Sequence, residues 1–331
     1  MSLISVVVPL FNEEGNVAEL LSRIGSIMER ECTGGDAYEI VAVDDGSSDG
    51  TLAMLRAERA RRPQLAIVAL SRNFGHQLAA TAGLDAARGD AVILMDGDLQ
   101  DPPELIRDFL AKWREGYDVV YAVRKTRRGE SFFKLLTARA FYRLIRRLTN
   151  VAIPVDTGDF RLMSRRVVDA LGSARERHRF LRGLVSWVGF AQIGVPYERD
   201  PRYSGTTKYP FSKMLRFALD GITSFSEIPL RFATYLGFLV SGFAFLYAVV
   251  VLVFKLLRLN EPGYTSMMLA ILFLGGVQLV AIGIVGEYLG RIYDQVKARP
   301  LYVVSSLERG SSEREAAGER PRAAPVETIS P

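Results

Sequence analysis

The residues best suited to chemistry form a short acidic run, in which Asp96, Asp98 and Gln100 alternate with Gly97 and Leu99. The run follows a short apolar segment, and at the end of a strand alternate side chains point to the same side. The two carboxylates and the amide can therefore converge on one cation. Their oxygens suit Mg²⁺ or Mn²⁺, and either ion also takes oxygens from a substrate diphosphate. An isolated Asp-x-Asp is usually a solvated turn, so the hypothesis depends on what lies beside it.

Two more acidic segments follow apolar runs earlier in the chain. Glu13 and Glu14 come soon after one such run, and Asp44 and Asp45 come directly after the next. Ligands of parallel α/β sheets bind beyond the carboxyl ends of the strands. Three acidic loops at one edge of one sheet therefore predict a site for a metal and a diphosphate.

The elements that must position these loops alternate along the first 125 residues. Short β-rich apolar runs predict strands at 4–8, 39–43, 65–70, 91–95 and 119–123. Helical periodicity predicts helices at 17–30, 51–61, 77–87 and 103–116. This alternation is typical of an α/β fold with a parallel sheet and helices on both of its faces.

Several common kinds of site are excluded by the sequence. A calcium loop that starts at Asp45 would need an acidic residue at its twelfth position, where Arg56 stands. No phosphate-binding or dinucleotide-binding glycine fingerprint is present, and no Ser or Cys has a recognisable nucleophile setting. The single cysteine, Cys32, excludes an internal disulfide framework. With 49% hydrophobic and 24% charged residues, the chain is not mostly disordered.

Two long segments without a charged residue, 232–254 and 263–286, distinguish the second half of the chain. About 20 apolar residues are enough to cross a bilayer as a helix. We therefore predict a transmembrane hairpin with helices at 232–257 and 263–287, the alternative being two buried core helices. The N-terminus lacks the basic segment of a signal peptide. We accordingly expect the residues before the hairpin and the C-terminus to be cytoplasmic.

Basic residues are concentrated between residues 124 and 182, where 16 Lys and Arg accompany 5 Asp and Glu. On a chain with a transmembrane hairpin, such a surface favours anionic lipid headgroups over nucleic acid. Amphipathic stripes at 130–149 and 210–231 predict interfacial helices. The alternative is that these stripes face the core or another subunit.

Six motifs together resemble a known family. They are VVVPLFNEE, VDDGSSDGT, RNFGHQLAATAGLDAARGD, MDGDLQDPPE, DTGDFRLM and RYSGTTKY. These motifs are similar to those of the GT-A family 2 glycosyltransferases. More narrowly, they resemble the polyprenyl-phosphate branch, which includes dolichol-phosphate mannose synthases, undecaprenyl-phosphate glucosyltransferases and aminoarabinose transferases. The resemblance runs from about residue 3 to about residue 304.

The resemblance implies a role for each matching position. The residues implied to hold the base and ribose are Pro9, Phe11, Glu13, Asp44 and Asp45. Those implied to hold the metal and diphosphate are Asp96, Asp98 and Gln100. Asp159 stands where the family places its proposed catalytic carboxylate. The residues that match acceptor-phosphate positions are Arg124, Arg202 and Lys208. Phe11 replaces a tyrosine common in the family, which keeps the ring for stacking but removes a hydroxyl.

The organisation implied in this way has four parts. A Rossmann-like GT-A catalytic domain spans 1–209, and a juxtamembrane amphipathic helix spans 210–231. Two transmembrane helices lie within 232–290, and a cytoplasmic segment at 291–331 becomes disordered after about residue 305. The resemblance also implies a homo-oligomer.

The implied reaction is an inverting transfer of glucose from UDP-glucose to undecaprenyl phosphate, with Mg²⁺ or Mn²⁺, at the cytoplasmic face of the plasma membrane. The same reaction with mannose from GDP-mannose, an N-acetylhexosamine or formyl-aminoarabinose stays open. So does the role of Asp159, as a base or as an orienting residue. A non-catalytic membrane scaffold that binds nucleotide sugar or lipid is an alternative of a different class, and metal-dependent turnover would exclude it.

Overall fold

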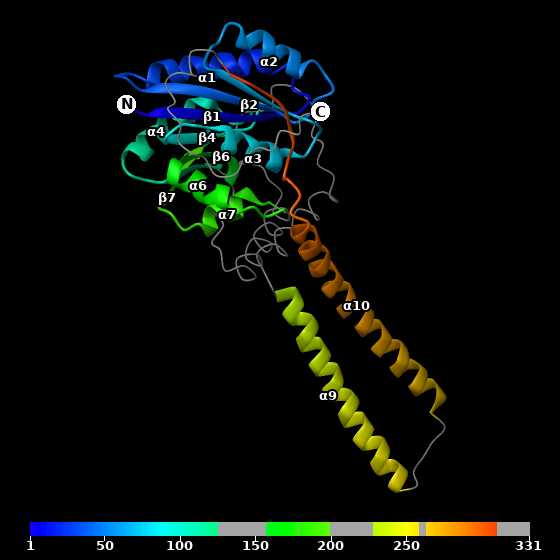
Figure 1. The fold of residues 1–331 in the computed structure, drawn as a ribbon. Coiled ribbons are helices and arrows are strands. Elements are labelled where there is room, and N and C mark those ends of the chain that lie inside the picture. The colour runs from blue at the N-terminus through cyan, green and yellow to red at the C-terminus, as the bar shows by residue number, and fades with distance from the viewer. Residues whose placement is uncertain (125–156, 178, 199–227, 258–262, 310–331) are drawn as a thin grey trace. The chain divides into compact units, whose positions relative to one another are not determined.

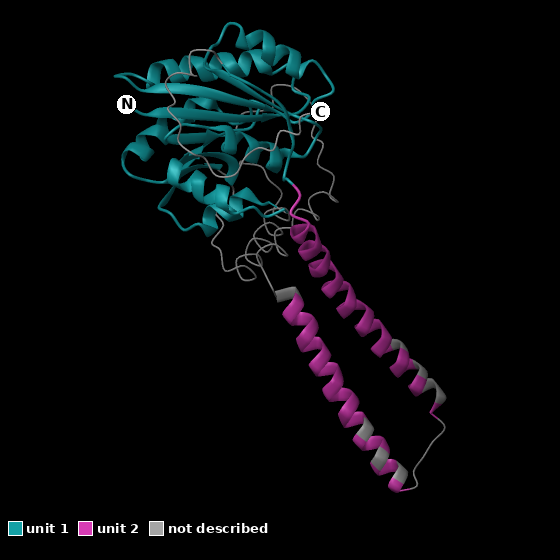
Figure 2. Cartoon of the chain, viewed as in Figure 1, with its two compact units in different colours: residues 1–143, 151–210, 300–331 teal, residues 144–150, 211–299 magenta. Residues whose placement is uncertain are grey.

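The computed structural model describes residues 1–124, 157–177, 179–198, 228–257 and 263–309. The chain divides into two compact units, which Figure 2 shows in different colours. One unit comprises 1–143, 151–210 and 300–331, and the other comprises 144–150 and 211–299.

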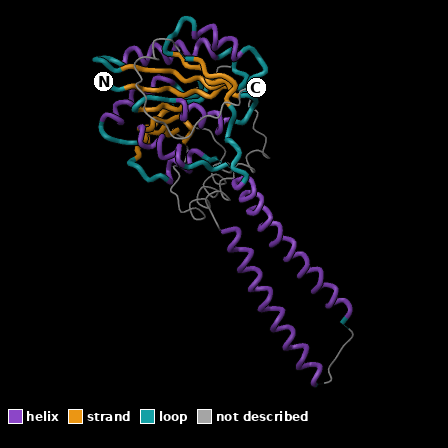
Figure 3. Tube along the Cα trace, in the orientation of Figure 1, coloured by secondary structure: helices purple, strands orange, loops and turns teal. Residues whose placement is uncertain are grey.

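The first unit is built on a sheet in which eight strands pair among the described residues (Figures 1 and 3). In spatial order they are β7 (Gln192–Tyr197), β5 (Val119–Arg124), β6 (Thr157–Ser164), β4 (Ala91–Leu94), β1 (Leu3–Leu10), β2 (Ala37–Asp44), β3 (Leu65–Leu70) and β8 (Val304–Glu308). β3, β2, β1 and β4 are parallel neighbours, as are β5 and β7. β6 and β8 run antiparallel to their neighbours. The five predicted strands are confirmed, but the sheet is mixed rather than wholly parallel.

Helices cover both faces of this sheet, as predicted. The first face carries α1 (Val17–Glu31), α2 (Thr51–Arg59), the short helix η1 (Pro103–Leu105) and α4 (Ile106–Arg114). The opposite face carries α3 (His76–Ala86), α6 (Arg165–Ser173) and α7 (Leu181–Trp187). The four predicted helices all form, and α6 and α7 are additional to them.

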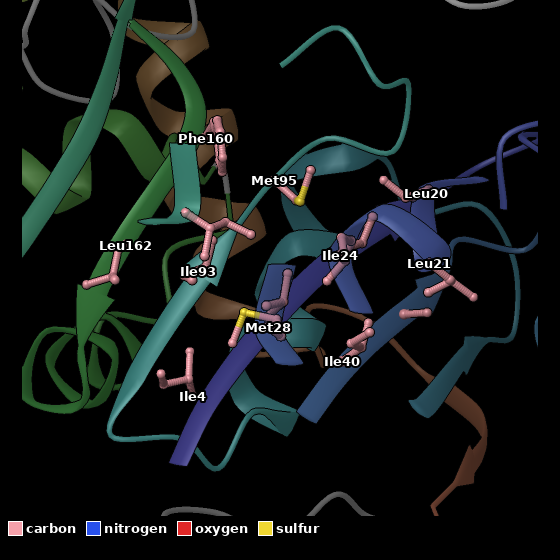
Figure 4. Close-up of a cluster of buried hydrophobic side chains, with 14 of the residues drawn as sticks. Ile4, Leu20, Leu21, Ile24, Met28, Ile40, Ile93, Met95, Phe160 and Leu162 are labelled. Carbon is pink, nitrogen blue, oxygen red and sulfur yellow. The ribbon is translucent and has the colours of Figure 1, made fainter. Parts of the chain in front are cut away.

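The main core lies between α1 and the centre of the sheet (Figure 4). Alternate side chains of β1, beginning with Ile4, point to this face and meet Ile24 and Met28 of α1 and Ile40 of β2. Each such side chain is essentially inaccessible to water, and full burial of one contributes about 1.5–3 kcal/mol. This core holds the strand ends that carry the acidic loops in a fixed arrangement.

On the opposite face, α3 lies unusually close to the sheet because Gly83 has no side chain. A Cβ atom at Gly83 would come within 2.3 Å of Val7 Cγ1 and 2.9 Å of Val43 Cγ2. The close approach fixes α3 against β1 and β2. The first residues of α3 are thereby held near the edge where β1 and β2 end.

The C-terminal segment of the chain returns to this unit as β8. The Ser71 backbone N–H donates to the Val303 carbonyl at 2.9 Å, and the Tyr302 hydroxyl donates to Asp85 Oδ2 at 2.6 Å. β8 continues to Glu308, and the disordered segment predicted after about residue 305 stays a prediction. Residues 310–331 lie outside the described part of the chain.

The second unit contains two long helices, α9 (Ile228–Leu256) and α10 (Tyr264–Val296), which pack against each other. Both are long and apolar enough to cross a membrane, with mean hydropathy of 2.0 and 2.4. Large apolar side chains on both, such as Phe238 and Leu279, are exposed, as expected for helices that face lipid. The interfacial helices predicted at 130–149 and, up to residue 227, at 210–231 lie outside the described residues.

Candidate functional site

The three acidic loops meet at one edge of the sheet. β1 and β2 run in register, so Leu10 at the end of β1 pairs with Asp44 at the end of β2. On the other side of β1, Val7 pairs with Leu94 at the end of β4. The carboxyl ends of all three strands therefore face the same way, as the sequence analysis predicts.

Hydrogen bonds join the loops after β1 and β2 into one rim. The Asn12 backbone N–H donates to Ser47 Oγ at 3.0 Å, and Asn12 Oδ1 accepts from the Ser48 backbone N–H at 2.8 Å. Asn12 has a φ of 55°, a left-handed conformation that asparagine tolerates better than most residues. Phe11, beside it, leaves 45% of its surface exposed, so its ring is accessible to a ligand.

The other residues predicted to bind the nucleotide have different surroundings. Pro9 is buried within β1, opposite Val43. Glu13 accepts a hydrogen bond from Asn16 Nδ2 at 2.5 Å. Asp44 is 2% exposed, and its Oδ1 accepts from the backbone N–H of Ser47, in its own loop, at 3.3 Å.

Asp45 connects the second acidic loop to the segment between β3 and α3. Its Oδ1 accepts from the Phe74 backbone N–H at 2.7 Å and its Oδ2 from the Gly75 backbone N–H at 2.9 Å. Burial raises the pKa of Asp45, although these two hydrogen bonds lower it. Asp45 therefore fixes the loop from which α3 begins.

Asp96 and Asp159 face each other across neighbouring strands. β4 and β6 pair antiparallel, with Leu94 opposite Arg161. Asp96 comes two residues after Leu94, and Asp159 comes two residues before Arg161. The two aspartates therefore lie opposite each other. His76, the first residue of α3, lies between them, with Nε2 3.3 Å from Asp96 Oδ1 and 3.3 Å from Asp159 Oδ2. Desolvation lowers the pKa of His76, but the hydrogen bond to Asp159 and the charges of both aspartates raise it to about 9.

Asp159 is held by donors from two other elements. Arg182 of α7 donates from Nε to Oδ1 at 2.7 Å and from Nη2 to Oδ2 at 3.3 Å. Gln77 of α3 donates from Nε2 to Oδ2 at 3.2 Å. Burial alone would raise the pKa of Asp159, but the charge of Arg182 and its hydrogen bonds hold that pKa well below its usual range. Asp159 is therefore a firmly ionised and weakly basic carboxylate.

Asp96 has the opposite electrostatic situation. Its Oδ1 is buried and accepts no hydrogen bond within the described part of the chain. Burial raises the pKa of Asp96 to about 6; His76 lowers it, and the neighbouring carboxylates raise it further. A buried carboxylate oxygen that accepts no hydrogen bond, and that in this part of the chain has only the His76 imidazole as a nearby positive group, fits a cation.

The residues that could hold a metal are only partly those predicted. Among the described residues, His76, Asp96 and Asp159 place potential ligand atoms within 4.8 Å of one another. Asp98 is not in this group, and its Oδ1 accepts the Gln100 backbone N–H at 3.2 Å within its own turn. The oxygen donors along this loop suit a hard divalent cation.

Arg124, at the end of β5, lies beside Gly158 of β6. A Cβ atom at Gly158 would come within 3.0 Å of Arg124 Nη2. Arg124 Nε donates to the Tyr197 hydroxyl at 3.1 Å, and that hydroxyl donates to Asp101 Oδ1. One residue predicted to bind the acceptor phosphate therefore contacts Tyr197 and Asp101 and lies beside the residue that precedes Asp159 in β6. The other two, Arg202 and Lys208, lie outside the described residues.

Comparison with known proteins agrees with the architecture of both units. The profile described as Glycosyl transferase family 2 matches residues 5–172, and that described as GtrB C-terminal hairpin matches residues 228–292. An uncharacterized glycosyltransferase of Synechocystis sp. is 50% identical over 305 residues, which cover 92% of this chain and 95% of the relative. An uncharacterized glycosyltransferase of Bacillus subtilis is 50% identical over 301 residues, 91% of this chain and 92% of the relative.

A third relative has a more specific name. The bactoprenol glucosyl transferase of Shigella phage SfII is 42% identical over 309 residues, covering 93% of this chain and 99% of the relative. With a family profile over half of its length and relatives that match it almost from end to end, the chain belongs to glycosyl transferase family 2, with a GtrB C-terminal hairpin following its catalytic unit.

Proposed function

We propose that this chain transfers glucose from UDP-glucose to undecaprenyl phosphate at the cytoplasmic face of the plasma membrane, with inversion at the sugar. The observation that carries the proposal is the convergence of Asp96 and Asp159 on His76 at the sheet edge. This cluster provides carboxylates for a metal, and Arg124, at the end of β5, would supply positive charge for the acceptor phosphate. The name of the phage relative supports the choice of sugar and carrier.

The donor side of the proposed site lies on the rim formed by the loops after β1, β2 and β4. The exposed Phe11 ring is available to stack on a base, and Glu13 and Asp44 lie on the same rim. Asp96, Asp98 and Gln100 would hold Mg²⁺ or Mn²⁺, which fits the buried Asp96 oxygen that accepts no hydrogen bond among the described residues. When bound, such an ion neutralises the charge of a leaving diphosphate.

For the acceptor, positively charged side chains are more important than a catalytic base. A lipid monophosphate has a second pKa near ~6 and is already largely ionised at neutral pH. Arg124, with Arg202 and Lys208, would gather its charge and place one of its oxygens in line with the sugar's anomeric carbon. Because Arg182 keeps Asp159 ionised and weakly basic, we assign Asp159 an orienting role.

The membrane hairpin explains where this chemistry would occur. The phosphate of a polyprenyl carrier lies at the membrane surface, so the catalytic unit must be tethered there. We propose that α9 and α10 provide that tether, with both chain ends on the cytoplasmic side, and that the chain works as a homo-oligomer.

A transfer assay on the detergent-purified full chain tests the proposal. Labelled UDP-glucose, GDP-mannose and UDP-N-acetylhexosamines are each supplied with undecaprenyl phosphate and Mg²⁺ or Mn²⁺, and label is followed into the organic phase. We expect transfer from UDP-glucose, lost with EDTA and in Asp98→Ala, and retained in Asp108→Ala, which removes an exposed carboxylate of α4. Nucleotide binding without transfer from any donor would overturn the proposal and favour a scaffold.

A further inference from the structure

The side-chain amide of Gln77 connects three elements at the site. Its Nε2 donates to Asp159 Oδ2 on β6 at 3.2 Å, and its Oε1 accepts the Leu181 backbone N–H of α7 at 3.0 Å. Gln77 itself is the second residue of α3. Both halves of one amide are therefore used, and each half reaches a different element.

The contact with Leu181 determines which half of the amide faces Asp159. A backbone N–H can only donate, so the carbonyl oxygen of Gln77 must face Leu181. The NH₂ group is then directed at the carboxylate, which can only accept. The orientation of this amide, which electron density often leaves ambiguous, follows here from its two partners.

Gln77 adds a second hydrogen bond at Oδ2 of Asp159, where Arg182 Nη2 also donates, at 3.3 Å. The shortest hydrogen bond from Arg182, at 2.7 Å, reaches Oδ1, whereas Gln77 reaches Oδ2. Donors at both oxygens restrain rotation about the last bond of the aspartate side chain, which is otherwise broad. Because Gln77 is neutral, it adds this restraint without adding a further charge beside Asp96 and His76.

The support behind Gln77 is itself rigid. Asp45 binds the two backbone N–H groups of Phe74 and Gly75 that precede α3, and Gly83 allows α3 to pack tightly on β1. The rim formed by the loops after β1 and β2 is thus connected to the carboxylate of Asp159 through the beginning of α3.

We infer that Gln77 is a positioning residue, which sets the orientation of the Asp159 carboxylate for sugar transfer. The inference rests on the proposed function, in which Asp159 orients the reacting groups. A hydrogen bond to a charged group, when lost, corresponds to about 10- to 100-fold in an equilibrium or a rate. Gln77→Leu should therefore lower kcat about 10- to 100-fold and change the KM for the sugar donor less than about threefold.

Two further variants separate positioning from folding. Gln77→Glu keeps an acceptor for Leu181 but replaces the donor to Asp159 with a carboxylate, so it should lose as much kcat as Gln77→Leu. Gln192→Leu is the matched control, because Gln192 also binds α7, donating to the Val185 carbonyl at 2.9 Å, but does not contact Asp159. We expect Gln192→Leu to keep wild-type kcat.

A double-mutant cycle in the full chain is the deciding experiment. If Gln77 acts through Asp159, adding Gln77→Leu to Asp159→Asn should lower kcat by less than about twofold more. A full further loss in the double variant, a loss expressed only in KM, or an equal loss in Gln192→Leu would overturn the inference.

The same cycle also has a readout that does not depend on the sugar. The changes in melting temperature of the two single variants should fail to add in the double variant, because Gln77→Leu removes the donor of this hydrogen bond and Asp159→Asn removes the charge of its acceptor. If the wild-type chain transfers no sugar, the proposed function fails on its own, and non-additive melting temperatures still report the contact. Additive melting temperatures would contradict it.

Discussion

Removal of the Tyr302 hydroxyl should loosen the strand that closes the sheet. In Tyr302→Phe the ring stays and only the hydrogen bond to Asp85 Oδ2, at 2.6 Å, is lost. Burial and the Asp85 carboxylate raise the pKa of Tyr302 above its usual range, so the hydroxyl is a protonated donor at every pH of interest. Tyr302 lies just before β8, at the point where the segment joins the first unit.

The size of the effect depends on the hydrogen bonds that Asp85 retains in the variant. A hydrogen bond to a charged group contributes about 1.5–3 kcal/mol. Asp85 retains two hydrogen bonds from Arg175, at 2.6 and 3.1 Å, so its charge is not left unpaired in the variant. The lower end of the range then applies, about 1.5 kcal/mol, which is about tenfold in the equilibrium for detaching β8.

Hydrogen exchange measures this equilibrium directly. When β8 detaches, the outer edge of β3 loses its partners, including the bond from the Ser71 N–H to the Val303 carbonyl. Peptides covering 65–71 and 300–309 should exchange about tenfold faster in Tyr302→Phe, while β1 and β2 keep their protection. The control is Tyr117→Phe, since Tyr117 also packs on the core but has no hydrogen-bond partner for its hydroxyl among the described residues. Unchanged exchange at 65–71, or faster exchange throughout the sheet, would refute the reasoning.

Three further predictions concern the first unit. Arg182→Met removes both guanidinium bonds to the β6 carboxylate and should lower kcat about 100-fold while UDP binding persists. Gly83→Ala should destabilise the chain by about 1–3 kcal/mol in thermal unfolding, because its Cβ would meet a valine of β1, whereas Gly172→Ala, with open space around it, should not. Burial raises the pKa of Asp118, but the hydrogen bonds from Arg166 hold that pKa below its usual range. Its contribution to stability is present at neutral pH, so the difference in melting temperature between wild type and Asp118→Asn should shrink below about pH 4.

The parts of the fold that could be predicted are those with a local signal. β1 to β5 are apolar runs bounded by polar loops, and the helices between them have clear periodicity. β8 has only two apolar residues in five, and it is stabilised by pairing with β3, more than two hundred residues away in sequence. Its existence depends on a long-range contact, which no local pattern reports.

The same distinction applies to the site. Asp96 and Asp98 can be recognised because they follow a predicted strand, and Asp159 is implied by a family motif; the family is confirmed. His76 and Gln77 lie in one of the motifs but are given no role there, and Arg182 lies in no motif. The antiparallel pairing of β4 with β6 brings Asp96 opposite Asp159. A sheet predicted from parallel strands alone does not contain that pairing.

The two aspartates illustrate how one edge of a sheet can give two carboxylates different tasks. Asp159 is compensated by a fixed protein cation, Arg182, and its pKa is far below the usual range. Asp96 has a buried oxygen that accepts no hydrogen bond within the described chain, and its pKa is raised to about 6. Environments that shift the pKa values of two neighbouring carboxylates in opposite directions are typical of sites that assign them separate roles. In the proposed reaction, Asp96 would meet a mobile cation that arrives with the sugar nucleotide, whereas Asp159 needs none. Since the lipid phosphate supplies its own negative charge, the reaction would depend on how accurately Asp159 is held rather than on how strongly it binds a proton.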